Sequence, residues 1–504
     1  MQKKQLTLVI VSLLVVVLSV SLAYFTAQII GKGKNLNVSS ANLQIVFTDS
    51  DGAISGSNIE PGWSDTKTFT IKNDTKTEYK YNIVIKDLLN TFVTNGYLKY
   101  KITSTNSGYN MTEFKDVPKS STPKDTILVY SVSIPVGVTQ SYTIEFKYAN
   151  DESVDQSDDM GKKLSGTLFI TEGIEEPVTL LSQILNDNPT RSTRSNNNNG
   201  TNDFATPLTT TTTGTLFTST ESIAGSTPKE VYYYAGNTTN NWVKFGGFYW
   251  RIIRTNHDGS IRLLYVGTSH DTTTGNIGES AFNTSSNSPK YVGYKYGEDT
   301  SLDTIRNNTT DSTIKTFIDS WYQNNLTNYT KYLSTSAVYC NDRSLGTGQT
   351  YSASAQFDFA LYYRMDSETY ETNPSYNCTD IRDAFSVDNT SAKLDYPVSL
   401  MTADEIVFAG GSFGTMNTPY AWFVSNSAGT EVFYEFWSLS PFFWNGSDAL
   451  VWYWCDVNMG LSDGDINNPF AVRPVISLKS CIKYSTGDGT AENPYTIKET
   501  TSGC

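Results

Sequence analysis

The sequence predicts a mainly β protein with an N-terminal membrane helix, an antiparallel β-sandwich or jelly roll, and a C-terminal α+β domain. Three observations support this fold class. Only 17% of the 504 residues are charged, against about 25% in typical proteins, and Ser, Thr, Asn, Gly and 32 tyrosines take their place. These residues favour strands and turns over long helices. Apolar residues alternate with polar ones at period two, and one long uncharged segment stands at the N-terminus.

The N-terminal segment, residues 1–31, is expected to be a signal-anchor or transmembrane helix. The run from Leu6 to Ile30 is uncharged and follows a short basic start. It exceeds the ~20 residues that a helix needs to span a bilayer. Small residues at Ser21 and Ala23 also suit a signal peptidase. We therefore expect either a cell-membrane protein whose C-terminal part is extracellular, or a secreted protein cleaved after Ala23.

The segment 35–172 is expected to form the β-sandwich. Aromatic and aliphatic residues occupy every second position in four runs, which are Tyr79–Ile85, Leu98–Ile102, Leu128–Ile134 and Tyr142–Tyr148. Such alternation gives each strand one buried and one wet face. Several such strands at short spacing are typical of an antiparallel sandwich.

Two short motifs belong to this part of the chain. One is Ala23-Tyr24-Phe25, and the other is a Pro61-Gly62 turn that leads into a strand ending at Asn73. Both resemble motifs of the camelysin/TasA-like envelope proteins of Gram-positive bacteria. The resemblance implies a β-sandwich, and some family members assemble into matrix fibres. Camelysin itself is described as a protease, but this segment has no histidine and so no HExxH zinc motif. We carry over the fold alone.

The segment 173–229 is expected to be a linker. Within 175–187, Val178, Leu181 and Ile184 fall on one helical stripe and predict a short helix. Tracts rich in Asn and Thr follow, and such tracts bury too little apolar surface to offset the entropy of ordering. We expect a flexible spacer here, with a long active-site loop as the alternative.

The segment 230–504 is expected to be an α+β ligand-binding domain. Its first strands flank a tight hairpin turn at Asn256–Ser260. Apolar residues at helical spacing predict a helix near Asp311–Leu326. A second, short helix is expected after Thr402, because Glu405 completes a capping box with it and Gly410 ends it.

The last part of the chain carries a characteristic order of motifs. It begins with WSLSP at Trp437–Pro441, continues through VWYWC, and ends with AVRPVISL at Ala471–Leu478 and a Gly-rich turn into Asn493-Pro-Tyr. This order resembles C-terminal domains of exported proteins of Gram-positive (Firmicutes) gut bacteria. More distantly it resembles C-type-lectin-like folds, including the branch of the formylglycine-generating enzyme. That branch works through a paired cysteine that binds copper, whereas these strands carry Cys455 alone.

All five cysteines lie in the second half of the chain. We expect two disulfides, Cys340–Cys378 and Cys481–Cys504, with Cys455 left free, although five cysteines permit other pairings. Disulfides agree with an exported protein, because they persist in oxidising compartments.

An aromatic cluster is the main candidate ligand site. Strand alternation places Trp452 and Trp454 on one face, and further candidate ligand-binding residues lie nearby, namely Trp444, Asn445, Asp448 and Asp456. An exposed platform of this kind would suit a glycan, which stacks its apolar ring face on Trp and gives its hydroxyls to polar groups. The alternative is that the tryptophans are all core.

The sequence gives little support for catalysis or for a cofactor. His257 and His270 lie far from Cys455 in the sequence and supply no nucleophile motif. Asp404 and Glu405 point about 100° apart on a helix and are a poor acid pair. A weak calcium site is conceivable at Asp463, Asp465 and Asn467, but the run lacks the distal bidentate Glu of an EF-hand loop. We therefore expect no catalytic residues, no cofactor and no metal.

The expected function is adhesion or ligand recognition at the cell surface, through binding of a glycan or a surface protein by the C-terminal domain. A net charge of −14, from 37 Lys+Arg and 51 Asp+Glu, argues against a nucleic-acid partner. The membrane is an expected partner through the N-terminal helix. Self-assembly into extracellular matrix or fibres is one alternative, and hydrolysis of envelope glycans is another.

Overall fold

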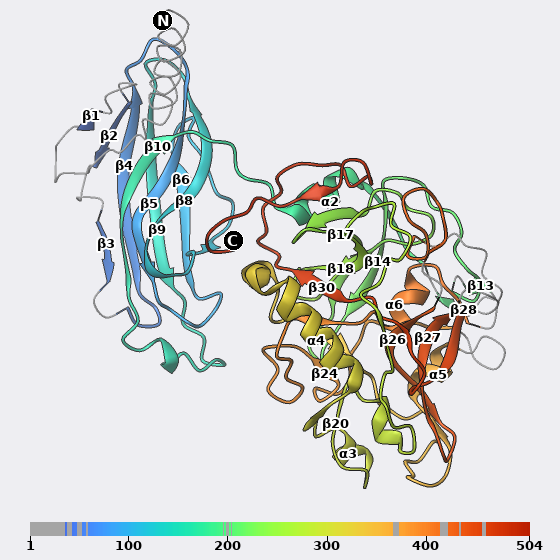
Figure 1. The fold of residues 1–504 in the computed structure, drawn as a ribbon. Coiled ribbons are helices and arrows are strands. Elements are labelled where there is room, and N and C mark those ends of the chain that lie inside the picture. The colour runs from blue at the N-terminus through green and yellow to red at the C-terminus, as the bar shows by residue number, and fades with distance from the viewer. Residues whose placement is uncertain are drawn as a thin grey trace, which may run out of the picture. The chain divides into compact units, whose positions relative to one another are not determined.

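The computed structural model describes residues 36–37, 43–47, 53–56, 59–194, 196–197, 201–202, 204–365, 372–413, 422–432, 435–455 and 460–504. The chain divides into two compact units, Met1–Glu176 and Pro177–Cys504. The predicted mainly β fold class is confirmed (Figure 1). The expected membrane helix and Ala23 lie outside the described residues. Among the described residues, no helix is long and apolar enough to cross a membrane.

The N-terminal unit is built from two antiparallel sheets. The first contains, in spatial order, β1 (Leu36–Asn37), β2 (Leu43–Phe47), β4 (Ser64–Asn73), β9 (Thr139–Tyr148), β6 (Leu98–Ser104) and β7 (Lys115–Asp116). The second contains β3 (Ala53–Gly56), β10 (Leu164–Glu172), β5 (Tyr79–Asn90) and β8 (Ser120–Ile134). A short 3-10 helix, η1 (Ser157–Asp159), precedes β10. Apolar residues of both sheets, such as Ile71, Ile144, Ile85 and Leu168, form one core, as in a β-sandwich.

The Pro61-Gly62 motif forms the expected turn into β4. Gly62 has φ +93°, a conformation that glycine adopts without strain, and the Trp63 amide donates to the Glu60 carbonyl at 2.9 Å. At the other end of β4, the buried Asn73 side chain donates to the carbonyls of Thr77 and Ile134, both at 2.9 Å. The turn and Asn73 therefore fix the two ends of one strand.

The C-terminal unit contains a large mixed sheet. Its main path is β11 (Thr190–Ser192), β14 (Thr215–Glu221), β15 (Lys229–Tyr233), β17 (Phe248–Thr255), β18 (Ile261–Gly267), β30 (Val475–Leu478) and β25 (Val398–Ser399). In addition, β16 (Trp242–Phe245) pairs with β17 and with β31 (Tyr495–Thr496). Strands from both ends of the unit thus lie side by side (Figure 1).

The structure differs from the linker that the sequence predicts over 173–229. The boundary falls after Glu176, and helix α2 (Leu180–Asp187) buries Leu180 and Ile184 in the core of the C-terminal unit. The Thr-rich strand β14 lies between β11 and β15 and buries Leu216 and Phe217. Pairing with β15, a contact between separate segments, orders a stretch whose composition favours a spacer. The short strands β12 (Asn196–Asn197) and β13 (Thr201–Asn202) pair with each other in this region.

A second sheet completes the C-terminal unit. It contains β19 (Glu279–Ser280), β29 (Phe470–Ala471), β26 (Glu435–Trp444), β27 (Ala449–Cys455) and β28 (Gly460–Asp465), and β23 (Phe357–Asp358) pairs with β26. Two small pairs are β20 (Lys295–Tyr296) with β21 (Thr310–Asp311), and β22 (Tyr339–Cys340) with β24 (Ala384–Phe385). The remaining helices are α3 (Leu302–Ile305), α4 (Thr313–Asn325), α5 (Ala360–Met365), α6 (Ala403–Phe408), η2 (Pro289–Val292) and η3 (Thr327–Tyr332).

The expected local features of this unit are present. Helix α4 lies at the predicted place, and α6 begins with the predicted capping box of Thr402 and Glu405. Both expected disulfides, Cys340–Cys378 and Cys481–Cys504, are formed, and Cys455 is free.

Candidate functional site

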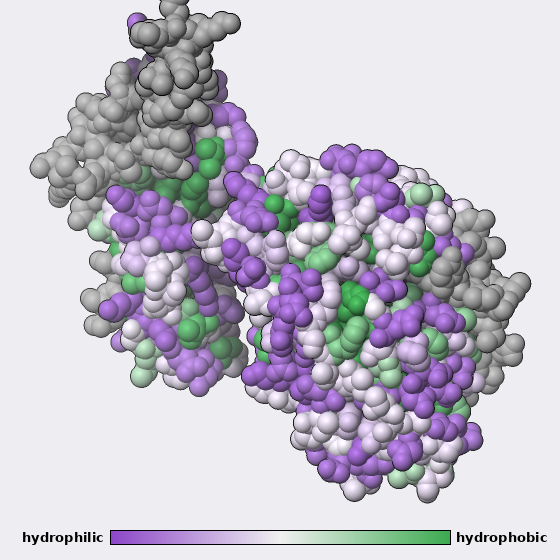
Figure 2. All heavy atoms as spheres, viewed as in Figure 1, coloured by the Kyte–Doolittle hydropathy of each residue, from purple (hydrophilic) through white to green (hydrophobic). Residues whose placement is uncertain are grey.

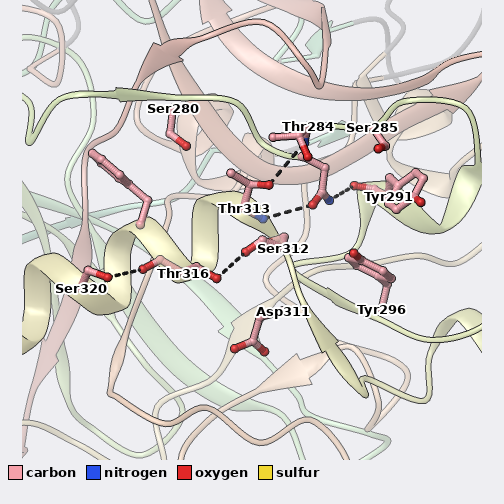
Figure 3. A pocket seen from close by; sticks show the side chains of 12 residues that line it. Ser280, Thr284, Ser285, Tyr291, Tyr296, Asp311, Ser312, Thr313, Thr316 and Ser320 are labelled. Atoms are coloured by element: carbon pink, nitrogen blue, oxygen red, sulfur yellow. Dashed lines mark hydrogen bonds between the residues drawn. The ribbon is translucent and has the colours of Figure 1, made fainter.

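A cavity of the C-terminal unit lies beside the start of α4, and we call it the α4 pocket. Its volume is about 560 Å³, within the range of small-molecule sites (Figure 3). The lining side chains come from α4, from the loop after β19, from η2 and from β20–β21, and they are Ser280, Asn283, Thr284, Ser285, Tyr291, Tyr296, Asp311, Ser312, Thr313, Thr316, Phe317 and Ser320.

Local hydrogen bonds hold the wall of this pocket in place. Ser312 is the N-cap of α4, and its hydroxyl accepts from the Lys315 amide at 3.2 Å. Asn283 ties the preceding loop to the helix, because its Oδ1 accepts from the Thr313 amide at 3.1 Å and its Nδ2 donates to the Tyr291 carbonyl at 2.6 Å. The polar wall is therefore pre-formed.

Hydroxyl groups supply most of the polar surface. Thr316 and Ser320 are exposed on one side of α4, and each hydroxyl donates to the carbonyl one turn earlier, at 3.1 and 2.9 Å. Their oxygen lone pairs remain available to accept from a ligand. Together with Thr313 they fall at helical spacing i, i+3 and i+7, which places them on one face.

Aromatic rings supply the apolar surface. Tyr291 and Tyr296 are half-buried, and their ring centroids lie 5.2 Å apart with the planes at 79°. Phe317 of α4 also lines the pocket. Rings next to hydroxyls can accept the apolar face of a sugar ring while its hydroxyls form hydrogen bonds.

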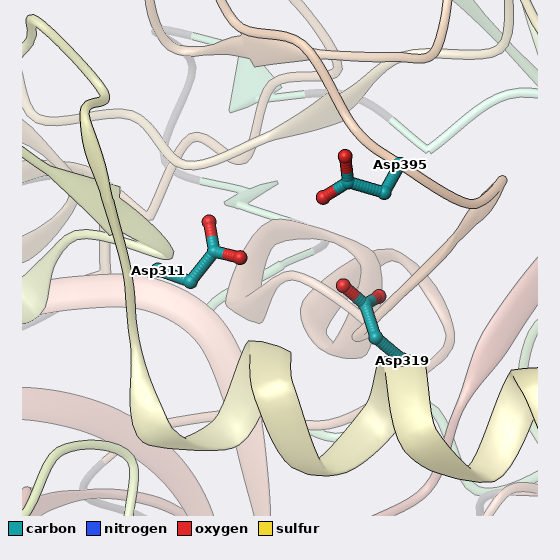
Figure 4. A group of neighbouring side chains, drawn as sticks. All are labelled: Asp311, Asp319 and Asp395. Carbon is teal, nitrogen blue, oxygen red and sulfur yellow. The ribbon is translucent and has the colours of Figure 1, made fainter.

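Three carboxylates gather at the edge of this pocket. Asp311, Asp319 and Asp395 point toward one another, with one oxygen of each within 4.8 Å of the others (Figure 4). The fully buried Lys315 ammonium donates to all three, at 3.1, 2.6 and 2.8 Å. A cation therefore already lies among these oxygens, and the arrangement fits an internal ion cluster.

The electrostatics of this cluster follow from burial and from Lys315. Burial alone lowers the pKa of Lys315, but the facing carboxylates, Asp319 first, raise it above its ordinary value. Burial raises the pKa of Asp319 despite the ammonium. The more exposed Asp395 has a lowered pKa, because Lys315 hydrogen-bonds its charged form. Asp311 also pairs with Lys295 at 2.8 Å.

The aromatic platform expected from the sequence is not exposed. Trp444, Trp452 and Trp454 are 1%, 0% and 3% exposed and belong to the core. The face of β27 that carries Trp452 and Trp454 is covered, since Phe442 packs edge-on to Trp452 at 4.5 Å and Phe423 edge-on to Trp454 at 4.9 Å. Among the described residues, the three indole N–H groups have no hydrogen-bond partner. These tryptophans therefore pack the unit and offer no stacking surface.

The polar residues proposed with this platform form a turn. Asn445 follows β26, and its Oδ1 accepts from the amides of Ser447 and Asp448 at 2.8 and 2.7 Å. Asp448 accepts from the Ser286 hydroxyl at 2.8 Å, and this bond is the largest cause of its lowered pKa. Both side chains thus close the hairpin between β26 and β27. Asp456 lies outside the described residues.

The run proposed as a weak calcium site belongs to strand β28 and the turn after it. Asp463 and Asp465 are both exposed on the same side of the strand. Two positions along a strand span about 6.6 Å, so these carboxylates do not wrap one cation as a calcium loop does. Asn467 is exposed in the turn.

The carboxylates weighed for catalysis are held in ion pairs. Glu405 is 1% exposed and accepts from Arg254 at 2.8 Å and from Arg262 at 2.5 Å. Asp404 accepts from Arg364 and from the Ser375 amide at 2.9 Å. Glu405 and Asp404 thus have different arginine partners.

The free thiol and the two histidines also lie apart. Cys455 is half-buried, and its Sγ lies 3.9 Å from Glu435 Oε1. His257 is in the hairpin turn, with its Nδ1 3.3 Å from Glu221 Oε2. His270 Nδ1 is 2.6 Å from the Ser427 hydroxyl. Each group has a different local neighbour.

The sequence analysis did not single out any α4 pocket residue. The sequence did contain a signal for this site, because Thr313, Thr316 and Ser320 fall at helical spacing and place three hydroxyls on one face of α4. The signal is weak by composition, since Ser and Thr are abundant throughout this chain. No protein-family model, curated protein or solved structure matches the chain.

Proposed function

We propose that this chain is a ligand-recognition or adhesion protein displayed outside a Gram-positive bacterial cell, and that its C-terminal unit binds a glycan in the α4 pocket. The observation that carries the proposal is the pairing, in one cavity of about 560 Å³, of two half-buried tyrosines with a row of hydroxyl groups. The finer fold expectations, camelysin/TasA-like for the first unit and C-type-lectin-like for the second, are part of this proposal.

Display outside the cell is supported by the two disulfides and by the uncharged segment at the N-terminus. The segment would anchor the chain in the membrane, or direct its secretion if it is removed.

The surface of the C-terminal unit favours a polar ligand. On the face shown in Figure 2, hydrophobic residues stand singly or in small groups among polar ones. Among the described residues of this unit, the large hydrophobic side chains that are exposed are Val178 and Ile381. A broad apolar patch is the usual mark of a protein-binding face, so the described surface supports a glycan over a protein partner.

The carboxylate in the lining of the α4 pocket already has cationic partners. Asp311, the one carboxylate in its lining, is paired with Lys295 and Lys315. A neutral sugar would meet hydroxyls and rings without disturbing these ion pairs.

The test is a glycan array probed with the full-length chain and with the double variant Thr316→Val, Ser320→Ala. Both positions are exposed, so the variant is expected to keep the melting temperature. Selective binding of neutral glycans that falls at least fivefold in the variant supports the proposal. Gln323→Ala, on an exposed position of α4 outside the pocket lining, is the matched control and is expected to bind normally. If the double variant binds glycans as well as Gln323→Ala does, the α4 pocket is not the binding site.

A further inference from the structure

Arg251 in β17 is a buried arginine without a carboxylate partner among the described residues. Its side chain belongs to the C-terminal unit and is 4% exposed. Four other buried arginines of this unit each contact a carboxylate within 2.9 Å, and these pairs are Arg254–Glu221, Arg262–Glu405, Arg306–Asp383 and Arg343–Asp383. Arg251 thus differs from these four arginines, each of which is matched to a carboxylate.

The contacts of Arg251 leave most of its donors unused. Nε donates to Asn241 Oδ1 at 2.5 Å, and Nη2 donates to the Thr238 carbonyl at 2.8 Å. A guanidinium has five N–H groups, so three of them have no partner within the described residues. Two rings pack near the group, since the guanidinium carbon lies 4.3 Å from the ring centroid of Trp242 and 5.5 Å from that of Trp422. The N–H donors of a guanidinium point outward in its plane, at its edge.

This arginine lines a cavity of about 540 Å³. Thr239, Ser425 and Ser427 add hydroxyl groups to the same lining. Glu492 also lines the cavity, but it is exposed and forms no ion pair with Arg251 in the described part of the chain. The cavity thus has a fixed cation, neutral hydroxyls, and room for more than a single carboxylate.

Burial without a counter-ion has an electrostatic cost. Burial lowers the pKa of Arg251 to about 9, and the group that acts against this change is Tyr234, which is no carboxylate. After burial itself, repulsion from Arg251 also lowers the pKa of Arg473. An anion at Arg251 would relieve both effects, since buried charges are stable when they are paired and hydrogen-bonded.

We propose that this cavity, the Arg251 pocket, is a second binding site that takes the carboxylate of an acidic sugar on Arg251. Carboxylates bind guanidinium edges through two parallel hydrogen bonds. The hydroxyls of Thr239, Ser425 and Ser427 would meet the hydroxyls of the sugar. This site is separate from the α4 pocket and does not depend on neutral glycans binding there.

The first experiment titrates the full-length chain with glucuronic acid, glucose, N-acetylglycine and inorganic phosphate. Calorimetry measures affinity, and tryptophan fluorescence reports on Trp242 and Trp422. Glucuronic acid is expected to bind at least tenfold more tightly than the other three. If glucose binds as tightly as glucuronic acid, the carboxylate is not recognised and the proposal is wrong. If N-acetylglycine binds as tightly as glucuronic acid, the sugar ring is not recognised. If inorganic phosphate binds as tightly, the site holds an adventitious ion only. Absence of glucuronic acid binding would also overturn the proposal.

Two variants locate the site. Arg251→Lys keeps the charge but loses the two-bond geometry, so we expect at least a tenfold loss of affinity for glucuronic acid. Thr239→Trp fills the cavity from its exposed rim, where the Thr239 side chain makes no hydrogen bond within the described residues, and it should abolish binding even if Arg251→Lys fails to fold.

The controls separate this site from the α4 pocket. Thr430→Trp places the same ring at a nearby exposed position outside the cavity lining and should bind glucuronic acid normally. The Thr316→Val, Ser320→Ala variant should also bind it normally. Loss of binding in either control, or normal binding in Thr239→Trp, would overturn the assignment to the Arg251 pocket.

Discussion

Replacing Glu221 by Gln should weaken the C-terminal unit in a way that depends on pH. Glu221 ends strand β14 and is 1% exposed. It accepts from Arg254 at 2.9 Å and from the His257 amide. Arg254 keeps a second carboxylate, Glu405, at 2.8 Å in the variant. The substitution therefore removes one charge without leaving a buried arginine unpaired.

The magnitude follows from the pKa of Glu221. Burial alone raises this pKa, but Arg254 and His257 outweigh burial and lower it from 4.5 to about 2. At about 1.4 kcal/mol per pH unit, that shift stabilises the folded state by about 3 kcal/mol at pH 7. Because the folded pKa lies below the unfolded one, this stabilisation is complete above about pH 4.5 and is lost as the pH falls toward 2. By the same linkage relation about 1.4 kcal/mol remains at pH 3.

Urea unfolding followed by tryptophan fluorescence measures this effect, because Trp63 is in the N-terminal unit and the other eight of the nine tryptophans are in the C-terminal one. Glu221→Gln should lose about 3 kcal/mol at pH 7, with an unchanged m-value, and about 1.4 kcal/mol at pH 3. Glu230→Gln, on the exposed side of neighbouring β15, is the control and should change stability by less than about 0.5 kcal/mol. A loss at Glu221 that is the same at both pH values would refute the reasoning.

Further predictions concern the ion cluster, the cysteines and the sandwich. Lys315→Met leaves three carboxylates facing one another and should cost about 3–5 kcal/mol in urea unfolding, part of which added Ca²⁺ restores in the variant but not in the parent chain. Replacing both Cys340 and Cys378 by Ser opens a 38-residue loop and should cost about 4 kcal/mol in the same assay. Mass spectrometry after thiol labelling without reductant should find one modified cysteine, Cys455, and a second labelled site would contradict the pairing. Asn73→Ala removes the side-chain donor to the buried Ile134 carbonyl and one of two donors to the Thr77 carbonyl, and it should lower the N-terminal unit's stability by about 1–2 kcal/mol, seen by Trp63 fluorescence.

Local patterns were sufficient to predict five strands of the N-terminal unit, β4, β5, β6, β8 and β9, and the start of α6. Period-two alternation is visible where a strand has one wet face, as in β9, where buried and half-exposed residues alternate throughout. In α6 the signal is the spacing of Thr402 and Glu405, which lie three residues apart. Each of these two signals lies within a short stretch of sequence.

Features that depend on distant contacts were not predictable in the same way. Strand β27 is covered on both faces, so alternation could not distinguish an exposed platform from core at Trp452 and Trp454. The Thr-rich strand β14 has the composition of a spacer, and its order comes from pairing with β11 and β15. Asp395 reaches Lys315 from 80 positions away, a contact that no local motif marks.

The low charge content of this chain has a consequence for recognition. Charged residues make up 17% of the whole chain. The C-terminal unit buries four arginines that are each matched to a carboxylate, and it buries a lysine among three aspartates. These charged side chains pair with one another inside the unit. Hydroxyl groups and tyrosine rings line most of the α4 pocket. Arg251 is buried without a matching carboxylate among the described residues, and in the proposed site an acidic sugar supplies its anion from outside the chain. The α4 pocket would therefore bind the hydroxyl groups of a neutral glycan, and the Arg251 pocket the carboxylate of an acidic sugar. Variants of one pocket should leave binding at the other unchanged.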